Sequence, residues 1–527
     1  MPSMWSECRT RSPFAPRTRD DRHAHRGGGS ANSTAADRTA GANAIEASTR
    51  VPDGAGDDRP GNLRPRCVRP ACWRWVDASG SGLCPRGRHA ARAHDDTSNG
   101  ERVTVMWVLP DMRDSVLDRA FLGFGASHPS TRMDVGLISY MTGAPPRLDD
   151  LRHIVEASLD RLPVLTHRLG GPASSARWEP TPDFRLDRHV VEAIAESPGR
   201  DGVAETAHRL LEQPLPPDTP WQLWLVSSPS QDCYGLYYRV HHAWQDGVAI
   251  AQMLLAIFSP MASEERPPPC PTEHWALRGV RAMTMATRIL GEVLQPAARG
   301  PVSGWHLSGH RRVTTAAAPL APLRDVARAC GGTVNDVHLA AVSGAIRAWS
   351  LEIGRQPAPV AVTVPINLRN PQERPGWGNY CLVRRVWLPC EEEEPLRRLS
   401  RTVIATAGLK SAQDRQAARD MLFTAPSFLV RFGTHCILNP RYAPVVASNV
   451  PCDDAGMVAS MGITDMVPLT LLPPGHPFNV CLTTFGDTAQ IAVISDKAVP
   501  FADRLPLLWR EAVDELTTAM SDGAAGR

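Results

Sequence analysis

The pattern of apolar and polar positions divides the chain into an unpatterned first segment and a patterned remainder. Residues 1–100 show little periodicity of either kind. Near Val116 a regular pattern begins, and it predicts a short helix followed by a strand that ends at Tyr140. Residues 148–162 carry apolar side chains at helical spacing and end at a proline, which cannot continue a helix. The patterned part therefore predicts helices and strands that alternate.

A strand followed directly by a helix is predicted near the middle of the chain. Residues 232–240 are aromatic and β-branched, as in a strand, whereas residues 248–258 are good helix formers over a length too great for one. His241 and His242 lie between them, on the turn. Successive strand residues point to opposite faces, so at most one imidazole easily faces a given pocket. We expect one histidine to be catalytic and the other structural.

The same alternation continues to the C-terminus. Thr333 is expected to cap a long helix, and residues 360–369 have the composition of a buried strand with a polar end. The other elements expected are a polar helix over 405–418, an apolar segment at 427–438 that lines a lipid path, a hairpin-like pair at 478–487 and 490–496, and a closing helix over 502–520.

Proline-rich sequence separates two domains. The prolines between 259 and 275 indicate a linker. Residues 278–294 predict an amphipathic helix, which either packs on the protein or touches a membrane. We expect four parts: residues 1–100 as a disordered extension or the product of a mis-annotated start, 101–258 as an N-terminal domain, 259–303 as linker and crossover helix, and 304–527 as a C-terminal domain.

The first hundred residues are rich in Arg, Gly, Ala, Asp and Pro. Such a composition cannot bury enough apolar surface to offset chain entropy, which predicts disorder. Translation starting at Met106 or Met112 is the other interpretation. Four side chains of metal-binding type occur here, but their spacing fits no standard zinc finger, so no metal site is expected: Cys67, Cys72, Cys84 and His89.

Composition and charge narrow the function classes. The 527 residues are 43% hydrophobic and 21% charged, which is ordinary for a globular protein, and a net charge of +2 gives no reason to expect nucleic acid as a partner. Twelve scattered cysteines without a secretory signal indicate reduced thiols and a cytoplasmic location. The sequence has no run of 18 apolar residues, so no membrane span is predicted, although peripheral membrane contact stays open.

The histidine turn carries the candidate chemistry. An imidazole with a pKa near 6.5 keeps a neutral fraction that can remove a proton from a hydroxyl group. Asp246 either pairs with a cation or caps the following helix, and Gly247 permits close backbone approach. Packing of both histidines in a core is the alternative interpretation of these residues.

The segment from His241 to Gly247 resembles the H-H-x-x-x-D-G signature of the acyl-CoA-dependent acyltransferase superfamily. Four further blocks resemble its bacterial wax ester synthase/diacylglycerol acyltransferase branch, in that family's order. They are an aspartate and a Phe-Leu pair at Asp118, Phe121 and Leu122; Trp178 through Phe184 to His189 and Val190; the T-V-N-D-V block that starts at Thr333; and the Ser-Asn-Val-Pro block at Ser448, although Cys452 begins a departure from the family's Gly-Pro.

The resemblance implies a fold and a set of roles. The fold is α/β, with two chloramphenicol-acetyltransferase-like domains whose mixed sheets flank a central tunnel. His242 is the implied general base, His241 is secondary, and Asp246 holds the turn by pairing with Arg369, because related acyltransferases pair their motif aspartate with an arginine. The supporting residues are Asn335 and Asp336, for which helix capping is the alternative, and Ser448 and Asn449, which either steady an oxyanion or close a strand.

The implied reaction moves a fatty acyl group from acyl-CoA to diacylglycerol or a long-chain alcohol, with no cofactor besides acyl-CoA as co-substrate. The expected location of the protein is cytoplasmic, either free or peripheral on the inner face of the plasma membrane or on lipid droplets. Two alternatives remain: a condensation-type acyltransferase that takes its acyl group from a carrier protein, and a non-catalytic lipid-binding protein of the same fold.

Overall fold

The computed structural model describes residues 116–258, 275–297, 300–369, 378–452 and 462–525. The expected disordered segment, the alternative start sites, the four zinc-type side chains and the proline-rich stretch 259–274 lie outside these residues. Residues 103–527 form one compact unit.

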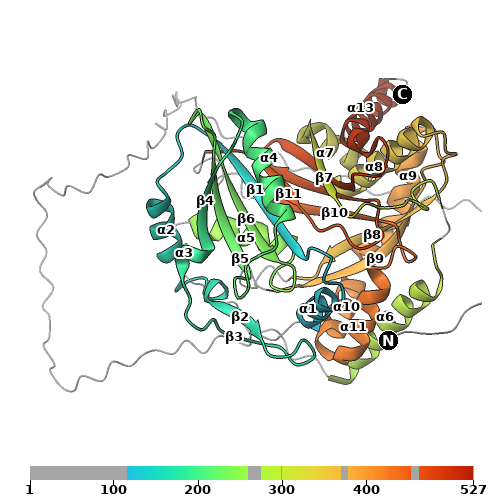
Figure 1. The fold of residues 1–527 in the computed structure, drawn as a ribbon. Coiled ribbons are helices and arrows are strands. Elements are labelled where there is room, and N and C mark those ends of the chain that lie inside the picture. The colour runs from blue at the N-terminus through green and yellow to red at the C-terminus, as the bar shows by residue number, and fades with distance from the viewer. Residues whose placement is uncertain (1–115, 259–274, 298–299, 370–377, 453–461, 526–527) are drawn as a thin grey trace, which may run out of the picture. The chain divides into compact units, whose positions relative to one another are not determined.

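A five-stranded mixed sheet carries the histidine turn (Figure 1). Its order is β11 (Ile463–Leu469), β1 (Asp134–Thr142), β6 (Cys233–His241), β5 (Trp221–Ser227) and β4 (Val190–Ile194). All neighbours are antiparallel except β4 and β5. Four strands come from the N-terminal half, whereas β11 comes from the C-terminal half and pairs along β1 from Gly136 to Met141. This sheet therefore joins sequence from both halves of the chain.

A six-stranded mixed sheet is built from the C-terminal half alone. Its order is β7 (Arg311–Pro319), β13 (Thr488–Asp496), β12 (Phe478–Phe485), β10 (Val445–Cys452), β8 (Val360–Asn367) and β9 (Cys381–Leu388). β10 is parallel to β12 and β8, and the other pairs are antiparallel. β10 pairs with β8 only at Val445 and Val446, while its pairing with β12 continues to Cys452. The second half of β10 is thus released from β8.

Helices pack around both sheets, and most of them bury an apolar stripe against a strand surface or another helix. Around the five-stranded sheet lie α1 (Val116–Ser127), α2 (Leu148–Glu156), η1 (Pro163–Thr166), α3 (Leu186–His189), α4 (Gly199–Glu212) and α5 (Gly247–Phe258), with the small hairpin β2 (His167–Gly170) and β3 (Arg177–Pro180). With the C-terminal half lie α6 (Trp275–Leu294), α7 (Leu320–Ala329), α8 (Val334–Glu352), α9 (Pro395–Thr406), η2 (Ala407–Lys410), α10 (Ala412–Thr424), α11 (Ser427–Ile437), η3 (Ala502–Arg504) and α13 (Leu505–Ala525).

The α/β fold with mixed sheets is confirmed. One expected helix is wrong, because residues 405–418 contain the end of α9, the turn η2 and the start of α10. The break falls at Ser411, whose hydroxyl accepts a hydrogen bond from the backbone N–H of Asp414 and so starts a new helix. The central tunnel stays a prediction.

Candidate active site

The turn that links β6 to α5 is fixed by capping and by close packing. Asp246 Oδ1 accepts a hydrogen bond from the backbone N–H of Ala249 at 3.0 Å, which caps the first turn of α5. At Gly247 a Cβ atom would lie 2.7 Å from Cγ2 of Val450 on β10, closer than real Cβ contacts allow. Only glycine therefore fits here without a shift of the Val450 side chain.

His241 has a structural set of contacts. Its Nδ1 accepts a hydrogen bond from the backbone N–H of Ala243 at 3.1 Å, and its ring meets the edge of Trp244. Burial, followed by the neighbouring His242, lowers the pKa of His241 to about 4. The ring is therefore neutral, and its hydrogen bond with Ala243 stabilises the turn.

His242 is held by a side chain from the other half of the chain. Its Nδ1 lies 3.0 Å from Oδ1 of Asn379. The Nδ2 of Asn379 donates to Oδ1 of Asp118 at 2.9 Å and to the backbone carbonyl of His242 at 2.8 Å, and its backbone N–H donates to Asp118 Oδ1 at 2.8 Å. Asp118 and Asn379 are both buried.

These contacts set the tautomer of His242. A carboxylate and a carbonyl only accept hydrogen bonds, so the amide nitrogen of Asn379 must face them and its oxygen must face the imidazole. The Nδ1 of His242 is then the donor, and Nε2 is left with its lone pair. A neutral imidazole with a free Nε2 is the form required of a general base.

The surroundings of His242 favour the neutral ring. Phe121 of α1 stacks on it with the ring centroids 4.4 Å apart. Burial lowers the pKa of His242, while its own backbone, Asp246 and Asn379 oppose that shift. The residue is nevertheless only half-buried, so part of it stays accessible.

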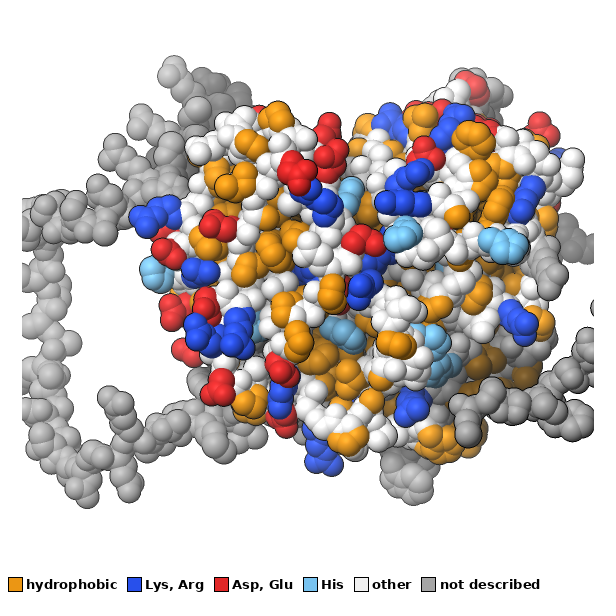
Figure 2. Space-filling model, in the orientation of Figure 1, with side chains coloured by type: hydrophobic (Ala, Val, Ile, Leu, Met, Phe, Trp, Pro, Cys, Tyr) orange, Lys and Arg blue, Asp and Glu red, His pale blue; other side chains and the backbone are white. Residues whose placement is uncertain are grey.

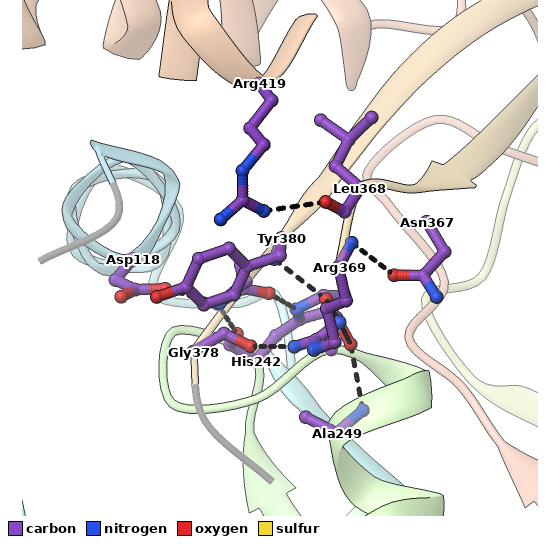
Figure 3. A network of polar contacts seen from close by, with 11 residues as sticks. Asp118, His242, Ala249, Asn367, Leu368, Arg369, Gly378, Tyr380 and Arg419 are labelled. Atoms are coloured by element: carbon purple, nitrogen blue, oxygen red, sulfur yellow. Dashed lines mark hydrogen bonds and ion pairs between the residues drawn. The ribbon is translucent and has the colours of Figure 1, made fainter. Parts of the chain in front are cut away.

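The predicted ion pair between Asp246 and Arg369 is present, and Figure 3 shows Arg369 beside Gly378 and Tyr380. Nη1 of Arg369 lies 2.7 Å from Oδ1 and 2.6 Å from Oδ2 of Asp246, and Nη2 donates to the carbonyl of Gly378 at 2.8 Å. The backbone N–H of Tyr380 also donates to Asp246 Oδ2. Burial alone would lower the pKa of Arg369, but Asp246 raises it above its ordinary value. Asp246 thus both pairs with a cation and caps α5.

A short stretch of the C-terminal half runs along the histidine turn. Gln245 forms a parallel β-bridge with Gly378, whose carbonyl accepts from the backbone N–H of Asp246 at 3.3 Å. The side chain of Gln245 accepts from the hydroxyl of Tyr238. Residues 378–380 therefore deliver Asn379 to His242, so the site needs both halves of the chain.

Asp336 caps a helix, which was the alternative interpretation of this residue. It forms a capping box with Thr333 at the start of α8, and it also accepts from the Thr406 hydroxyl and the Lys410 ammonium group. Asn335 lies half-buried on the first turn of the same helix. These contacts join α8 to η2, and a supporting role for the pair at His242 remains a prediction.

Ser448 and Asn449 lie on the part of β10 that has left β8. Burial raises the pKa of the Cys481 thiol to about 12, and the neighbouring Ser448 side chain opposes that shift. Oδ1 of Asn449 is buried, and within the described part of the chain it has no hydrogen-bond partner. Val450, the next residue, is the one that touches Gly247. The expected oxyanion role of the two residues stays a prediction.

Trp178 and His189 have packing contacts. Nδ1 of His189 donates to the carbonyl of Trp221, and its ring stacks on Phe184 and lies tilted against Trp221, while Trp178 meets the edge of Trp244. Both residues therefore pack against the five-stranded sheet and the histidine turn.

Two residues of the site had no role in the sequence analysis. Asp118 was noted only as part of the first resembling block, and Asn379 was not among the candidate residues. Each lies far from His242 in sequence, so periodicity could not join them. The sequence signal that could have found Asn379 was its position beside Gly378, in a turn that follows the polar strand end at Arg369.

Two family models match the chain. The wax ester synthase/diacylglycerol acyltransferase catalytic domain matches residues 115–299, and the WS/DGAT C-terminal domain matches residues 377–517. The first match contains His242 and Asp118, and the second contains Asn379.

Similar proteins carry related names. A putative diacylglycerol O-acyltransferase of Mycobacterium tuberculosis is 33% identical over 281 residues, which are 46% of this chain and 59% of that protein's length. A probable diacylglycerol O-acyltransferase of the same organism is 23% identical over 427 residues, covering 72% of this chain and 90% of the relative.

Solved structures share the fold. A wax ester synthase/diacylglycerol acyltransferase from Marinobacter aquaeolei VT8 superposes with a TM-score of 0.52 at 21% identity, covering 76% of this chain and 98% of that one. The first condensation domain of the calcium-dependent antibiotic synthetase superposes with a TM-score of 0.54 at 17% identity, covering 76% and 94%.

Proposed function

Because the chain belongs to the wax ester synthase/diacylglycerol acyltransferase family, we propose that it transfers a fatty acyl group from acyl-CoA to a hydroxyl group. The acceptor is diacylglycerol, which gives triacylglycerol, or a long-chain alcohol, which gives a wax ester. The observation that carries the proposal is the hydrogen bond between His242 Nδ1 and Asn379 Oδ1, which leaves Nε2 of His242 as a base.

The reaction proceeds in one addition and one elimination. Nε2 of His242 takes the proton of the acceptor hydroxyl as its oxygen attacks the thioester carbonyl, so a C–O bond forms and negative charge collects on the carbonyl oxygen. The C–S bond then breaks, and the CoA thiolate leaves with the proton held by His242. No acyl-enzyme intermediate forms, and general-base assistance of this kind is worth roughly 10²–10⁴ in rate.

Other residues stabilise the two charged species of the reaction, which are the imidazolium and the oxyanion. Asn379 and Asp118 stabilise the imidazolium that exists between the two steps, because Asn379 Oδ1 accepts from Nδ1 and Asp118 holds the amide in place. Ser448 and Asn449 are our candidates for stabilising the developing oxyanion. No cofactor takes part besides acyl-CoA as co-substrate.

The location follows from the chemistry of the substrates. No helix in the described residues combines the length and hydropathy needed to cross a membrane. Diacylglycerol and long-chain alcohols reside in lipid phases, so we infer peripheral contact with the inner face of the plasma membrane or with lipid droplets. The two substrates meet at His242 through the tunnel expected between the sheets.

A competition assay tests the function. Purified protein receives labelled palmitoyl-CoA with diacylglycerol and hexadecanol together, and the lipid products and free CoA thiol are quantified. We expect labelled ester and thiol in equal amounts, and near-complete loss of both in His242→Ala with an unchanged circular dichroism spectrum. Transfer only from an acylated carrier protein would assign the condensation-type reaction. Absence of transfer from every donor would leave a lipid-binding protein.

A further inference from the structure

Helix α11 turns large apolar side chains toward solvent. Phe428, Leu429 and Phe432 are 69%, 52% and 61% exposed. Phe428 and Phe432 are four residues apart and therefore lie on one face of the helix. Burial of such residues elsewhere stabilises a protein, so a cluster left in water indicates a surface that meets a partner.

Helix α6 repeats this arrangement. One of its faces is buried against β8, β9 and α10 through Met285, Ile289 and Ala282. A second apolar face is exposed and consists of Val280, Met283, Leu290 and Leu294. Packing requires only the first face. The second face therefore has no function in holding the described fold together.

The two helices are neighbours. α6 contacts α11, and Val293 of α6 and Ile437 of α11 pack on the same small core (Figure 1). Of the 13 exposed large hydrophobic residues in the described part of the chain, seven belong to this pair of helices, which concentrates them on one region. We call the outward apolar residues of the two helices the α6/α11 face.

The charge around the α6/α11 face is positive. The helices α6, α10 and α11 together contain six arginines and three acidic residues. Arg431 is the only charged residue of α11 at neutral pH and is exposed. On α6, the acidic Glu292 is bonded to Arg384 and to the hydroxyl of Tyr442. Arg281 and Arg288 pair with Asp420 and Asp414, which leaves a net excess of arginine. Apolar side chains beside such an excess are the composition that binds an anionic lipid surface.

The face is one helix away from the candidate active site. α11 packs on α1, and the side chain of Arg431 crosses α1 at Gly123, where a Cβ would lie 3.2 Å from Arg431 Cδ. α1 carries Phe121, which stacks on His242, and Asp118, which holds Asn379. A lipid surface at α11 would therefore lie close to the reacting groups.

We propose that the α6/α11 face docks on the surface of an anionic lipid bilayer and brings the site to the lipid acceptor. The delivery of acceptor rests on the proposed function, whereas the docking itself does not. A second copy of the chain is the less suitable occupant, because two such faces would bring arginines of like charge together.

Vesicle co-sedimentation tests the proposal. The full chain is incubated with vesicles of phosphatidylcholine and phosphatidylglycerol, or of phosphatidylcholine alone, and the bound fraction is measured. We expect stronger binding to the anionic vesicles. The double variant Phe428→Gln, Phe432→Gln should bind roughly tenfold or more weakly, since each buried phenylalanine contributes substantially to interfacial affinity.

A matched variant controls for lost apolar surface in general. Leu351 of α8 and Leu507 of α13 are 53% and 51% exposed outside the α6/α11 face. The double variant Leu351→Gln, Leu507→Gln should bind as the unaltered chain does. Equal binding by all three proteins would overturn the proposal, as would a dimer without vesicles that only the phenylalanine variant disrupts. Binding retained by His242→Ala separates docking from catalysis.

Discussion

The Nδ1 atom of His242 lies 3.0 Å from the Oδ1 atom of Asn379, a residue 137 positions later in the chain. Because Asn379 is itself fixed by Asp118, the imidazole is held in one tautomer from outside its own turn. The candidate base and the group that orients it therefore come from different halves of the chain.

Replacement of Asn379 tests this orientation. In Asn379→Ala the ring loses its acceptor and can present the wrong nitrogen, so we expect kcat to fall by roughly 10²-fold or more while KM changes little. Rates with palmitoyl-CoA and hexadecanol provide the measurement. Asn439→Ala, at an exposed asparagine that caps its own turn, is the control and should leave both parameters unchanged. Unaltered kcat in Asn379→Ala would remove the orienting role.

The acid limb of the pH profile reports the ionisation of His242. Burial lowers the pKa of His242 below 6.5, and the base must be neutral. Activity should therefore persist below pH 6.5 and decline only as the pH falls through the lowered pKa. Measurement of kcat/KM from pH 5 to 8, with protein stability checked at each pH, gives the midpoint. A midpoint above 6.5 would contradict this assignment.

The ion pair of Asp246 and Arg369 should be costly to break. Their side chains are 8% and 6% exposed, and removal of one partner from a buried pair typically costs about 3–5 kcal/mol. Arg369→Met should therefore lower the free energy of unfolding in urea. The exchange Asp246→Arg with Arg369→Asp should recover little, because Asp246 also accepts from the N–H groups of Ala249 and Tyr380. Full recovery would mean that charge pairing alone matters there.

The close contact at Gly247 predicts a compensating pair. Gly247→Ala forces a methyl group against Val450, which should destabilise the fold by about 1–3 kcal/mol. Val450→Ala in the same chain removes the obstructing methyl groups and should restore part of that loss. Gly291→Ala on α6, where a Cβ meets open space, should by contrast be neutral or stabilising. Urea titrations of Gly247→Ala, of Val450→Ala, of the double variant and of Gly291→Ala measure the coupling.

Buried neutral histidines predict acid sensitivity. His338 is fully buried on α8, neither ring nitrogen has a hydrogen-bond partner in the described structure, and burial lowers its pKa to about 3. The unfolded chain binds this proton near pH 6.5, so stability is complete above that pH and is lost as the pH falls toward 3. At pH 5 the loss is about 2 kcal/mol for this residue.

Replacement of that histidine should flatten the dependence. His338→Leu removes both the protonation and the unpaired nitrogens, so we expect a more stable protein whose free energy of unfolding changes less between pH 7 and 5. His189 and His476, with pKa values lowered to about 4 by burial, should leave a residual slope. An unchanged slope in His338→Leu would show that the ring is accessible to protons in the native state.

Local sequence predicted the elements of the site better than their assembly. The strand, turn and helix around His242 follow from β-branched residues, an aspartate cap and a helix-forming run, all within a few positions of one another. The resemblance supplied the partner of Asp246. The contact of Asn379 with His242 depends instead on how two sheets meet, and no spacing in the sequence encodes that distance.

Polar residues with two plausible roles were the hardest to assign. Asp336 begins a helix and lies in a block that resembles the family, so the residues alone favoured capping whereas the resemblance favoured support of the site. Its contacts with Thr333, Thr406 and Lys410 reveal the capping role. The expected helix over 405–418 failed for a similar reason, because the strength of Ser411 as a cap was overlooked.

The strand β11 has a consequence for how the molecule is made and divided. It belongs to the later half of the polypeptide and completes the sheet that bears His242. A fragment that ends before residue 463 would expose the unpaired edge of β1, and unpaired strand edges promote aggregation. The N-terminal half therefore cannot complete its own sheet. Ribosomal synthesis must pass this strand before the histidine turn acquires its final surroundings.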